Sequence, residues 1–439
     1  MSDTIFAVAT GRGKSGLTVV RVSGPDAAAA LESFQIRSLI PRRASLRRLM
    51  ARDGGVIDEA VCLWFPAPAS FTGEDTLEFH CHGALSVVSL MLELLGQIPG
   101  FRLAQPGEFS RRALDNGRLD LASAEGLSDL IDSETEQQRR QAIRQLMGGL
   151  SREVDGWRAE LIGVLALFEA ELDFSDEGDV DTGVLHEAGA RLTRLRDQMA
   201  SILAAGIRGE RVREGIIVVL AGAPNAGKST LLNALAQRDV AIVSPIPGTT
   251  RDIVEARLDL GGYPVTVLDT AGLRTSSDIV EQEGVKRMLA RAAVADIVLW
   301  LQRADELQAG LPAELEDVTG IVIPVVTQID RAPAGGDGIA ISALTGEGMS
   351  QLFSVLGELS TRLAGSGRES ALLTRARHRE AVAEALESID RALGILHSTG
   401  TELVVEEVRI AMRAVARVTG HVGVEHVLDQ LFSQFCIGK

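Results

Sequence analysis

Apolar and polar residues alternate over short runs in the first part of the chain, and longer periodic stretches lie between these runs. Residues 18–22 and 60–65 predict strands, because every second side chain of a half-buried strand faces the core. Residues 25–34 and 84–97 predict helices. Short strands mixed with helices predict an α+β module.

The pattern becomes helical between residues 119 and 208, where apolar positions recur every three or four residues. This periodicity predicts long bundle helices, and Gly206 and Gly209 predict a hinge at their end. The helical pattern returns at residues 372–396 and 402–435. The simplest architecture is a discontinuous helical bundle with another domain inserted between its halves.

The inserted segment begins with an apolar run that opens into Gly222-x4-Gly227-Lys228-Ser229. The glycines let successive backbone N–H groups turn inward around phosphate oxygens, Lys228 adds a positive charge, and Ser229 offers a hydroxyl to Mg²⁺. A helical pattern follows directly. The spacing is typical of a P-loop and predicts an α/β nucleotide-binding domain.

Further motifs follow in the order of a GTPase. Residues 247–252 offer a loop with a second hydroxyl for the metal, and residues 265–272 predict a buried strand that brings Asp269 and Gly272 to the γ-phosphate. Asp330 follows another apolar strand, where its two oxygens can accept hydrogen bonds from the N1–H and exocyclic amine of guanine. Residues 342–344 are expected to close over the base.

One pair of positions departs from the usual GTPase pattern. Thr327 and Gln328 stand where these proteins normally carry Asn and Lys. Thr is shorter than Asn and Gln lacks the charged stem of Lys, so we expect contacts to the base and to the phosphate loop to be lost or rearranged. Affinity for guanine should suffer more than selectivity. An ATPase with an altered base pocket is an alternative that Asp330 opposes.

Composition limits the possible partners. A chain of 439 residues predicts two to four domains, and 46% hydrophobic residues are sufficient for packed cores. The net charge of −16 opposes unspecific binding to nucleic acid or anionic membranes, so any RNA contact must use local basic patches. Such patches are more often solvated surface, and we leave them unassigned from the sequence. The candidates are Arg42, Arg43, Arg47 and Arg48, and then Arg139, Arg140 and Arg144.

The three cysteines, Cys62, Cys81 and Cys436, have no metal-ligand spacing. The first residues lack the charged and apolar regions of a signal peptide, and no apolar run reaches the roughly 18 residues needed to span a bilayer. These features predict a cytoplasmic protein without a membrane partner.

Longer sequence motifs occur along the whole chain. They lie at residues 16–24, 71–75 with Glu78, 106–110, 119–125, 269–274 and 436–439. With them the chain resembles the family of tRNA-modification GTPases called MnmE or TrmE. The resemblance implies four segments: an N-terminal α+β tetrahydrofolate-binding and dimerisation domain at 1–117, a helical domain at 118–211, an inserted Ras-like P-loop G domain at 212–367, and the second helical part at 368–439.

The resemblance also implies an activity. A GTP-hydrolysing homodimer would act with an FAD-dependent partner of the MnmG family, in a heterotetramer or larger complex, to add a carboxymethylaminomethyl or aminomethyl group to C5 of the wobble uridine of tRNA. The one-carbon unit would come from 5-formyltetrahydrofolate or a related tetrahydrofolate. The implied folate ligands are Arg21, Glu78, Arg118 and Lys439, and Cys436 is a candidate for further chemistry.

Leu273 stands where many GTPases carry a water-positioning glutamine. The resemblance implies that K⁺-stimulated dimerisation of the G domains replaces it, with K⁺ supplying positive charge near the phosphates. Glu281 would orient the attacking water beside the catalytic Lys228 and Asp269. The implied metal ligands are Ser229 and Thr250 for Mg²⁺, and Asn225, Ser244, Ile246 and Thr249 for K⁺.

The implied nucleotide contacts are Asn225, Ala226, Gly227, Lys228, Ser229, Thr230, Ser244, Pro245, Ile246, Pro247, Gly248, Thr249, Thr250, Asp269, Thr270, Ala271, Gly272, Thr327, Gln328, Ile329, Asp330, Ser342, Ala343 and Leu344. A GTPase switch for assembling ribosomes or other RNA particles, without modification chemistry, is the alternative function. The phosphate loop and switches alone permit it, whereas the folate-type motifs and residues 436–439 argue against it.

Overall fold

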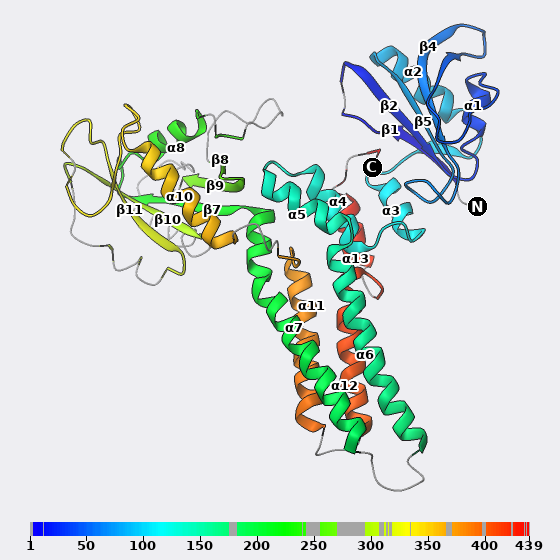
Figure 1. Cartoon of the computed structure of the whole chain (residues 1–439). Helices are drawn as coiled ribbons and strands as arrows, with labels where there is room; N and C mark the ends of the chain where they lie inside the picture. Colours follow the sequence, from blue (N-terminus) through cyan, green and yellow to red (C-terminus); the bar gives the residue numbers. More distant parts are fainter. Residues whose placement is uncertain are drawn as a thin grey trace, which may run out of the picture. The chain divides into compact units, whose positions relative to one another are not determined.

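Figure 1 shows the helices and strands of the computed structural model. The chain divides into two compact units. The first unit comprises Met1–Ser128, Ser151–Arg158 and Val415–Lys439, and the second comprises Asp129–Leu150 and Ala159–Ala414. The described residues are 3–11, 13–174, 182–238, 240–242, 255–269, 295–306, 311–312, 315, 318–333, 335–365, 371–396, 401–422, 425–433, 435 and 437–438.

A six-stranded sheet forms the centre of the first unit, in the order β3-β4-β5-β2-β1-β6. Strands β1 and β6 are parallel and the other pairs are antiparallel. The α+β prediction for this region is therefore confirmed. The strands are β1 (Thr4–Val8), β2 (Ser15–Ser23), β3 (Ser45–Met50), β4 (Val56–Phe65), β5 (Thr76–Gly83) and β6 (Phe101–Leu103).

Two helices, α1 (Ala29–Ser33) and α2 (Leu85–Gly96), contribute to the core of this sheet. Phe6, Phe34 and Phe79 are almost fully buried there, and the rings of Phe34 and Phe79 meet edge to face at 5.0 Å. A smaller apolar cluster joins α4 (Leu121–Ile131) to α13 (Glu425–Ser433), and α13 also packs beside α3 (Glu108–Asp115). Residues far apart in sequence thus share one core.

The helical part confirms the prediction of long helices before and after the inserted domain. Helix α7 packs along α11 within the second unit. The helices are α5 (Glu136–Leu146), α6 (Gly149–Phe174), α7 (Thr182–Glu214), α11 (Ala376–Ile395) and α12 (Thr401–Thr419). No helix in the described part of the chain is long and apolar enough to cross a membrane.

The predicted hinge at Gly206 and Gly209 is wrong, because α7 continues through both residues. A Cβ at position 209 would lie 2.2 Å from the carbonyl oxygen of Leu373, and one at position 206 would lie 2.8 Å from the side chain of Arg379. The missing side chains let α7 approach this neighbouring segment closely. These glycines therefore serve helix packing.

The inserted domain has a second six-stranded sheet, in the order β12-β11-β10-β7-β9-β8. All neighbours are parallel except β8 and β9. The predicted α/β fold is confirmed. Its elements are β7 (Ile216–Gly222), α8 (Lys228–Ala236), β8 (Glu255–Leu260), β9 (Tyr263–Asp269), β10 (Ile297–Arg303), β11 (Ile321–Thr327), β12 (Ile339–Ala340) and α10 (Met349–Ala364).

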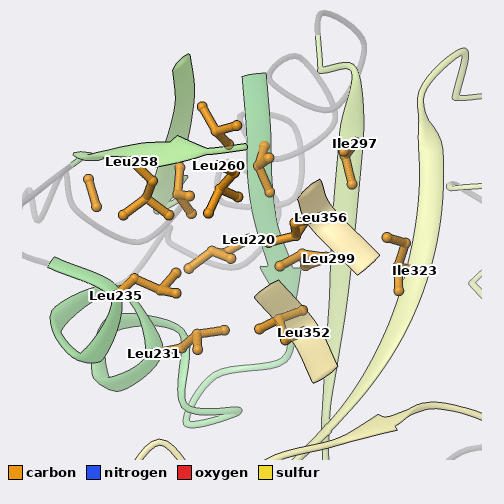
Figure 2. Packing of buried hydrophobic residues seen from close by; sticks show 14 of the residues in the cluster. Leu220, Leu231, Leu235, Leu258, Leu260, Ile297, Leu299, Ile323, Leu352 and Leu356 are labelled. Carbon is orange, nitrogen blue, oxygen red and sulfur yellow. The ribbon is translucent and has the colours of Figure 1, made fainter. Parts of the chain in front are cut away.

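One apolar cluster connects the helices of this domain to its sheet (Figure 2). Leu231 and Leu235 of α8 lie in it with Leu220 of β7, and Leu352 and Leu356 of α10 complete it. All five side chains are fully buried. Their packing fixes the start of α8 close to the carboxyl end of β7, where the phosphate loop lies.

Candidate nucleotide-binding site

Glycines shape the loop between β7 and α8. Gly222 has φ 148°, and a Cβ there would lie 2.4 Å from the carbonyl oxygen of Leu301 in β10. Gly227 has φ 89° and caps α8. Only glycine adopts such angles and close approaches without strain. The loop consequently presents its backbone N–H groups and the helix N-terminus toward one anion-binding space.

Lys228 folds back over this loop. Its side chain is mostly buried, and Nζ donates hydrogen bonds of 2.8 Å to the carbonyl oxygens of Gly222 and Ala223. Burial lowers the pKa of the ammonium, and the nearby carboxylate of Asp269 opposes this shift. The loop therefore holds the lysine charge where phosphate oxygens would be bound.

The predicted Mg²⁺ ligand Ser229 meets the carboxylate at the end of β9. Ser229 Oγ donates a 2.8 Å hydrogen bond to Oδ2 of Asp269, whose side chain is 2% exposed. Hydroxyl and carboxylate oxygens are hard donors of the kind that Mg²⁺ prefers, and Mg²⁺ usually takes few protein ligands. The donor set at this point fits the metal that the sequence predicts.

Asp330 lies just past β11 and is exposed at the predicted base pocket. Ser342 Oγ donates a 2.6 Å hydrogen bond to its Oδ1, and this bond lowers the pKa of the Asp330 carboxyl. The carboxylate is thus ionised and oriented at neutral pH, as an acceptor for two base N–H groups requires. Leu344, two residues after Ser342, is 80% exposed and leaves its apolar surface available to a base.

The two unusual residues at the end of β11 contact the phosphate loop. Thr327, which is 4% exposed, donates a 2.8 Å hydrogen bond to the carbonyl oxygen of Ala226. Gln328 Nε2 donates a 3.0 Å bond to the carbonyl oxygen of Asn225. Asn225 and Gln328 both have positive φ, at 63° and 60°. Contacts between this strand end and the loop are therefore rearranged and not lost.

Arg331 is a residue of the pocket that the sequence reasoning missed. Its Nη1 donates to Oε1 of Gln328 at 3.3 Å, which leaves the amide nitrogen of Gln328 facing the loop. No GTPase motif includes this contact, which accompanies a turn in which the Arg331 N–H donates a 2.9 Å hydrogen bond to the carbonyl oxygen of Gln328.

Residues 225–230, 327–330 and 342–344 follow the carboxyl ends of the parallel strands β7, β11 and β12, so they meet at one edge of the sheet. Ligands of open α/β sheets bind at this edge. The other predicted site residues lie outside the described residues: Ser244, Pro245, Ile246, Pro247, Gly248, Thr249, Thr250, Thr270, Ala271, Gly272, Leu273, Glu281, Cys436 and Lys439.

A second polar cluster lies on the sheet of the first unit. Arg21 of β2 faces Glu78 of β5 across the ladder, with Arg21 Nη2 2.9 Å from Glu78 Oε1. His80 Nε2 lies 3.1 Å from the other oxygen of Glu78. The Arg21 guanidinium also lies 5.5 Å from the ring centroid of Phe71, which is 37% exposed. The sequence reasoning missed His80 and the position of this ring.

Two further segments reach the same sheet. The exposed Arg118 packs its stem against Gly73, where a Cβ would lie 3.2 Å from Arg118 Cγ. Ile437 forms an antiparallel bridge with Pro106, and Gly438 lies so close to Val8 that a Cβ would sit 2.1 Å from the Val8 carbonyl oxygen. Val8 neighbours Ala7, which pairs with Arg21.

The parallel sheet, the phosphate loop and an oriented carboxylate at the base pocket define the inserted domain as a P-loop GTPase domain. A family model described as the MnmE helical domain matches residues 121–436, and another described as the GTP-binding protein TrmE N-terminus matches residues 4–118. The chain belongs to the MnmE family, also called TrmE, as its motifs predicted.

Curated relatives extend over the full length. A "tRNA modification GTPase MnmE" of Methylobacterium sp. (strain 4-46) is 51% identical over 447 residues and covers 100% of both chains. One of Rhodopseudomonas palustris (strain BisB5) is 48% identical over 460 residues, 100% of this chain and 99% of that one. Among solved structures, the G domain of the T. maritima FeoB iron transporter is 25% identical over 34% of this chain and 99% of that chain, with a TM-score of only 0.24.

Proposed function

We propose that this chain is the GTP-hydrolysing component of the machinery that modifies C5 of the tRNA wobble uridine. Family membership supports the tRNA role, since the full-length relatives carry the name tRNA modification GTPase. The Lys228, Ser229 and Asp269 geometry supports nucleotide binding. The product group is carboxymethylaminomethyl or aminomethyl, and the partner is an FAD-dependent protein of the MnmG family that joins a homodimer of this chain.

Within this proposal each side chain at the phosphate loop has one task. Lys228 holds the β- and γ-phosphates, and Ser229 with Thr250 holds Mg²⁺, which neutralises charge on the phosphates when it is bound. Asp269 orients the Ser229 hydroxyl through their 2.8 Å bond. Asn225, Ser244, Ile246 and Thr249 would hold K⁺, which would supply positive charge near the phosphates when two G domains pair. Glu281 orients the attacking water.

The cluster around Arg21 forms the folate-binding site of the proposal. When bound, the tetrahydrofolate supplies the one-carbon unit. Glu78 accepts hydrogen bonds from the pterin ring, and the cations Arg118 and Lys439 pair with the glutamate carboxylates. A partly exposed carboxylate held between Arg21 and His80, beside an exposed aromatic ring, has the chemistry that such a ligand needs.

One observation carries this assignment. The bridge of Ile437 to Pro106 and the contact of Gly438 with Val8 place residues 437 and 438 beside β1, the neighbour of the strand that carries Arg21, and Lys439 comes next in the sequence. The domains of the proposal are residues 1–117, 118–211, 212–367 and 368–439.

Nucleoside analysis of tRNA tests the proposal directly. A strain lacking this chain should lose the modified wobble uridine, and the wild-type chain should restore it. Arg21→Ala should fail to restore the nucleoside although it keeps GTPase activity, whereas Lys228→Ala should lose both. Unchanged tRNA nucleosides in the deletion strain, together with defective ribosome assembly, would favour the assembly-switch function instead.

A further inference from the structure

A run of arginines lies on the surface of the first unit. Residues 37–52 contain six arginines and no Asp or Glu, in a chain with 44 basic and 60 acidic residues. All six are exposed. We call this surface the arginine edge; it consists of Arg37, Arg42, Arg43, Arg47, Arg48 and Arg52.

Strand β3 gives the arginine edge its position. Among the described residues it is the terminal strand of the sheet, and its one pairing partner there is β4. Arg47 stands opposite Ala60, and the next residue, Arg48, stands opposite Glu59. Because successive side chains of a strand point to opposite faces, the cations lie on both sides of this sheet margin.

Few carboxylates neutralise these charges. Arg48 pairs with the exposed Glu59 at 2.7 Å. The nearby Asp58 is already bound, since it accepts hydrogen bonds from the ring and the backbone N–H of His82 at 2.8 and 2.7 Å. Arg42 contacts the carbonyl oxygen of Ala69, which carries no full charge. Within the described ranges, the other five arginines of the edge make no ion pair.

The second arginine run of the sequence has a different environment. On α5, Arg139 lies 2.8 Å from a carboxylate oxygen of Glu136 and Arg140 lies 2.7 Å from the other. Their hydrogen bonds lower the pKa of Glu136 to about 2, so it stays ionised between them. The structure thus separates two runs that look alike in sequence.

We propose that the arginine edge binds the phosphate backbone of tRNA; this inference rests on the function proposed above. Guanidinium groups match phosphate oxygens in charge and geometry, and their contacts release counterions whatever the base sequence. With a net charge of −16, most of the protein surface repels RNA at long range, so a local surplus of cations decides where RNA docks. Phosphate contacts at the edge would position the tRNA without reading its bases.

Two double variants with equal charge change test the proposal on the full-length protein. Arg43→Gln with Arg47→Gln removes two charges from the arginine edge, and Arg139→Gln with Arg140→Gln removes two from α5. The probe is an unmodified tRNA transcript, measured by filter binding over a range of KCl concentrations. The edge variant should bind roughly tenfold or more weakly, with a salt slope smaller by about two units, whereas the α5 variant should match the wild type.

GTPase activity at saturating GTP serves as the folding control and should be the same in all three proteins. If the edge variant and the wild type bind tRNA with equal affinity, the inference about the arginine edge is wrong, but the function proposed above is unaffected. Unchanged tRNA binding combined with self-association of the edge variant would overturn the inference too, since the arginines would then only block edge-to-edge strand pairing. The inference is also wrong if the edge variant still binds tRNA normally but no longer binds an acidic protein partner. A wild-type chain that does not bind the tRNA transcript would overturn the inference, whereas the function proposed above is decided separately by the tRNA nucleosides of the deletion strain.

Discussion

The carbonyl oxygens of Asn225 and Ala226 are each held by a side chain from the end of β11. The usual Asn and Lys are absent there, and Thr327 and Gln328 provide the two N–H or O–H donors instead. Sequence reasoning foresaw a change at these positions but left its outcome open. The sequence pattern does not give the distance between the end of β11 and the phosphate loop, because that distance depends on the packing of the whole sheet.

Gln328→Ala should weaken the binding of GDP and GTP alike by about 2- to 13-fold. The change removes one hydrogen bond to the phosphate loop, and such a bond contributes about 0.5–1.5 kcal/mol. Calorimetric titration measures the effect. Gln328→Glu is the matched control for shape: it keeps the volume but faces the Asn225 carbonyl with an acceptor, so it should bind no better than the alanine variant. Wild-type affinity in Gln328→Glu would show that the bond does not contribute.

Among the elements, those with local signals were predictable. The apolar run of β7, the glycine spacing and the periodicity of α8 lie within one short segment, so pattern alone identified the phosphate loop. The hinge prediction at Gly206 and Gly209 was wrong because two nearby glycines usually indicate a break in a helix. Here Gly209 is needed because Leu373, far along the chain, packs directly against it. The pairing of Arg21 with Glu78 likewise depends on strand register.

Gly438→Ala should detach the segment that docks on β1. The residue has φ 104°, and a Cβ would collide with the carbonyl oxygen of Val8 at 2.1 Å. Hydrogen exchange should rise at residues 435–438 and at their contacts near Val8 and Pro106. Gly394→Ala is the matched control, because that glycine lies within α11 with nothing inside 4 Å of a Cβ. Equal exchange in both variants would contradict the docking.

Glu108, at the start of α3, gives a pH dependence. Burial raises the pKa of its carboxyl, but hydrogen bonds from Arg102, Arg112 and the Gln105 N–H outweigh this effect and lower the pKa below its ordinary value. The resulting stabilisation is complete above the unfolded pKa of about 4.3 and is lost as pH falls through the lower folded value.

Glu108→Gln should therefore show faster exchange of β6 and α3 amides than the wild type at pH 7. The difference should shrink as the pH falls below about 4, because the wild-type carboxyl is then protonated as well. Comparing both proteins at each pH cancels the intrinsic pH dependence of exchange. A difference that stays constant down to acid pH would show that the negative charge of Glu108 is not the source of the stabilisation.

For the whole molecule, hydrolysis should depend on the cation and on protein concentration. If K⁺ bound near Asn225 promotes pairing of two G domains, the GTPase rate per molecule should rise with protein concentration in K⁺ but not in Na⁺ at equal ionic strength. Asn225→Ala should bring the K⁺ to Na⁺ rate ratio close to one. Equal wild-type rates in the two salts would contradict the proposed role of K⁺.

The bridge between Pro106 and Ile437 also has a consequence for the newly made chain. Ile437 is synthesised 331 residues after Pro106 (437 − 106 = 331), which takes about 15 to 65 seconds at usual rates of translation. Most of the first sheet can form within that interval, but the margin beside Val8 stays uncovered until the last of these residues leaves the ribosome. If translation stops before residue 437, the G domain of the truncated chain can still fold while one side of the proposed folate site is missing, so we expect truncated products to hydrolyse GTP without taking part in modification.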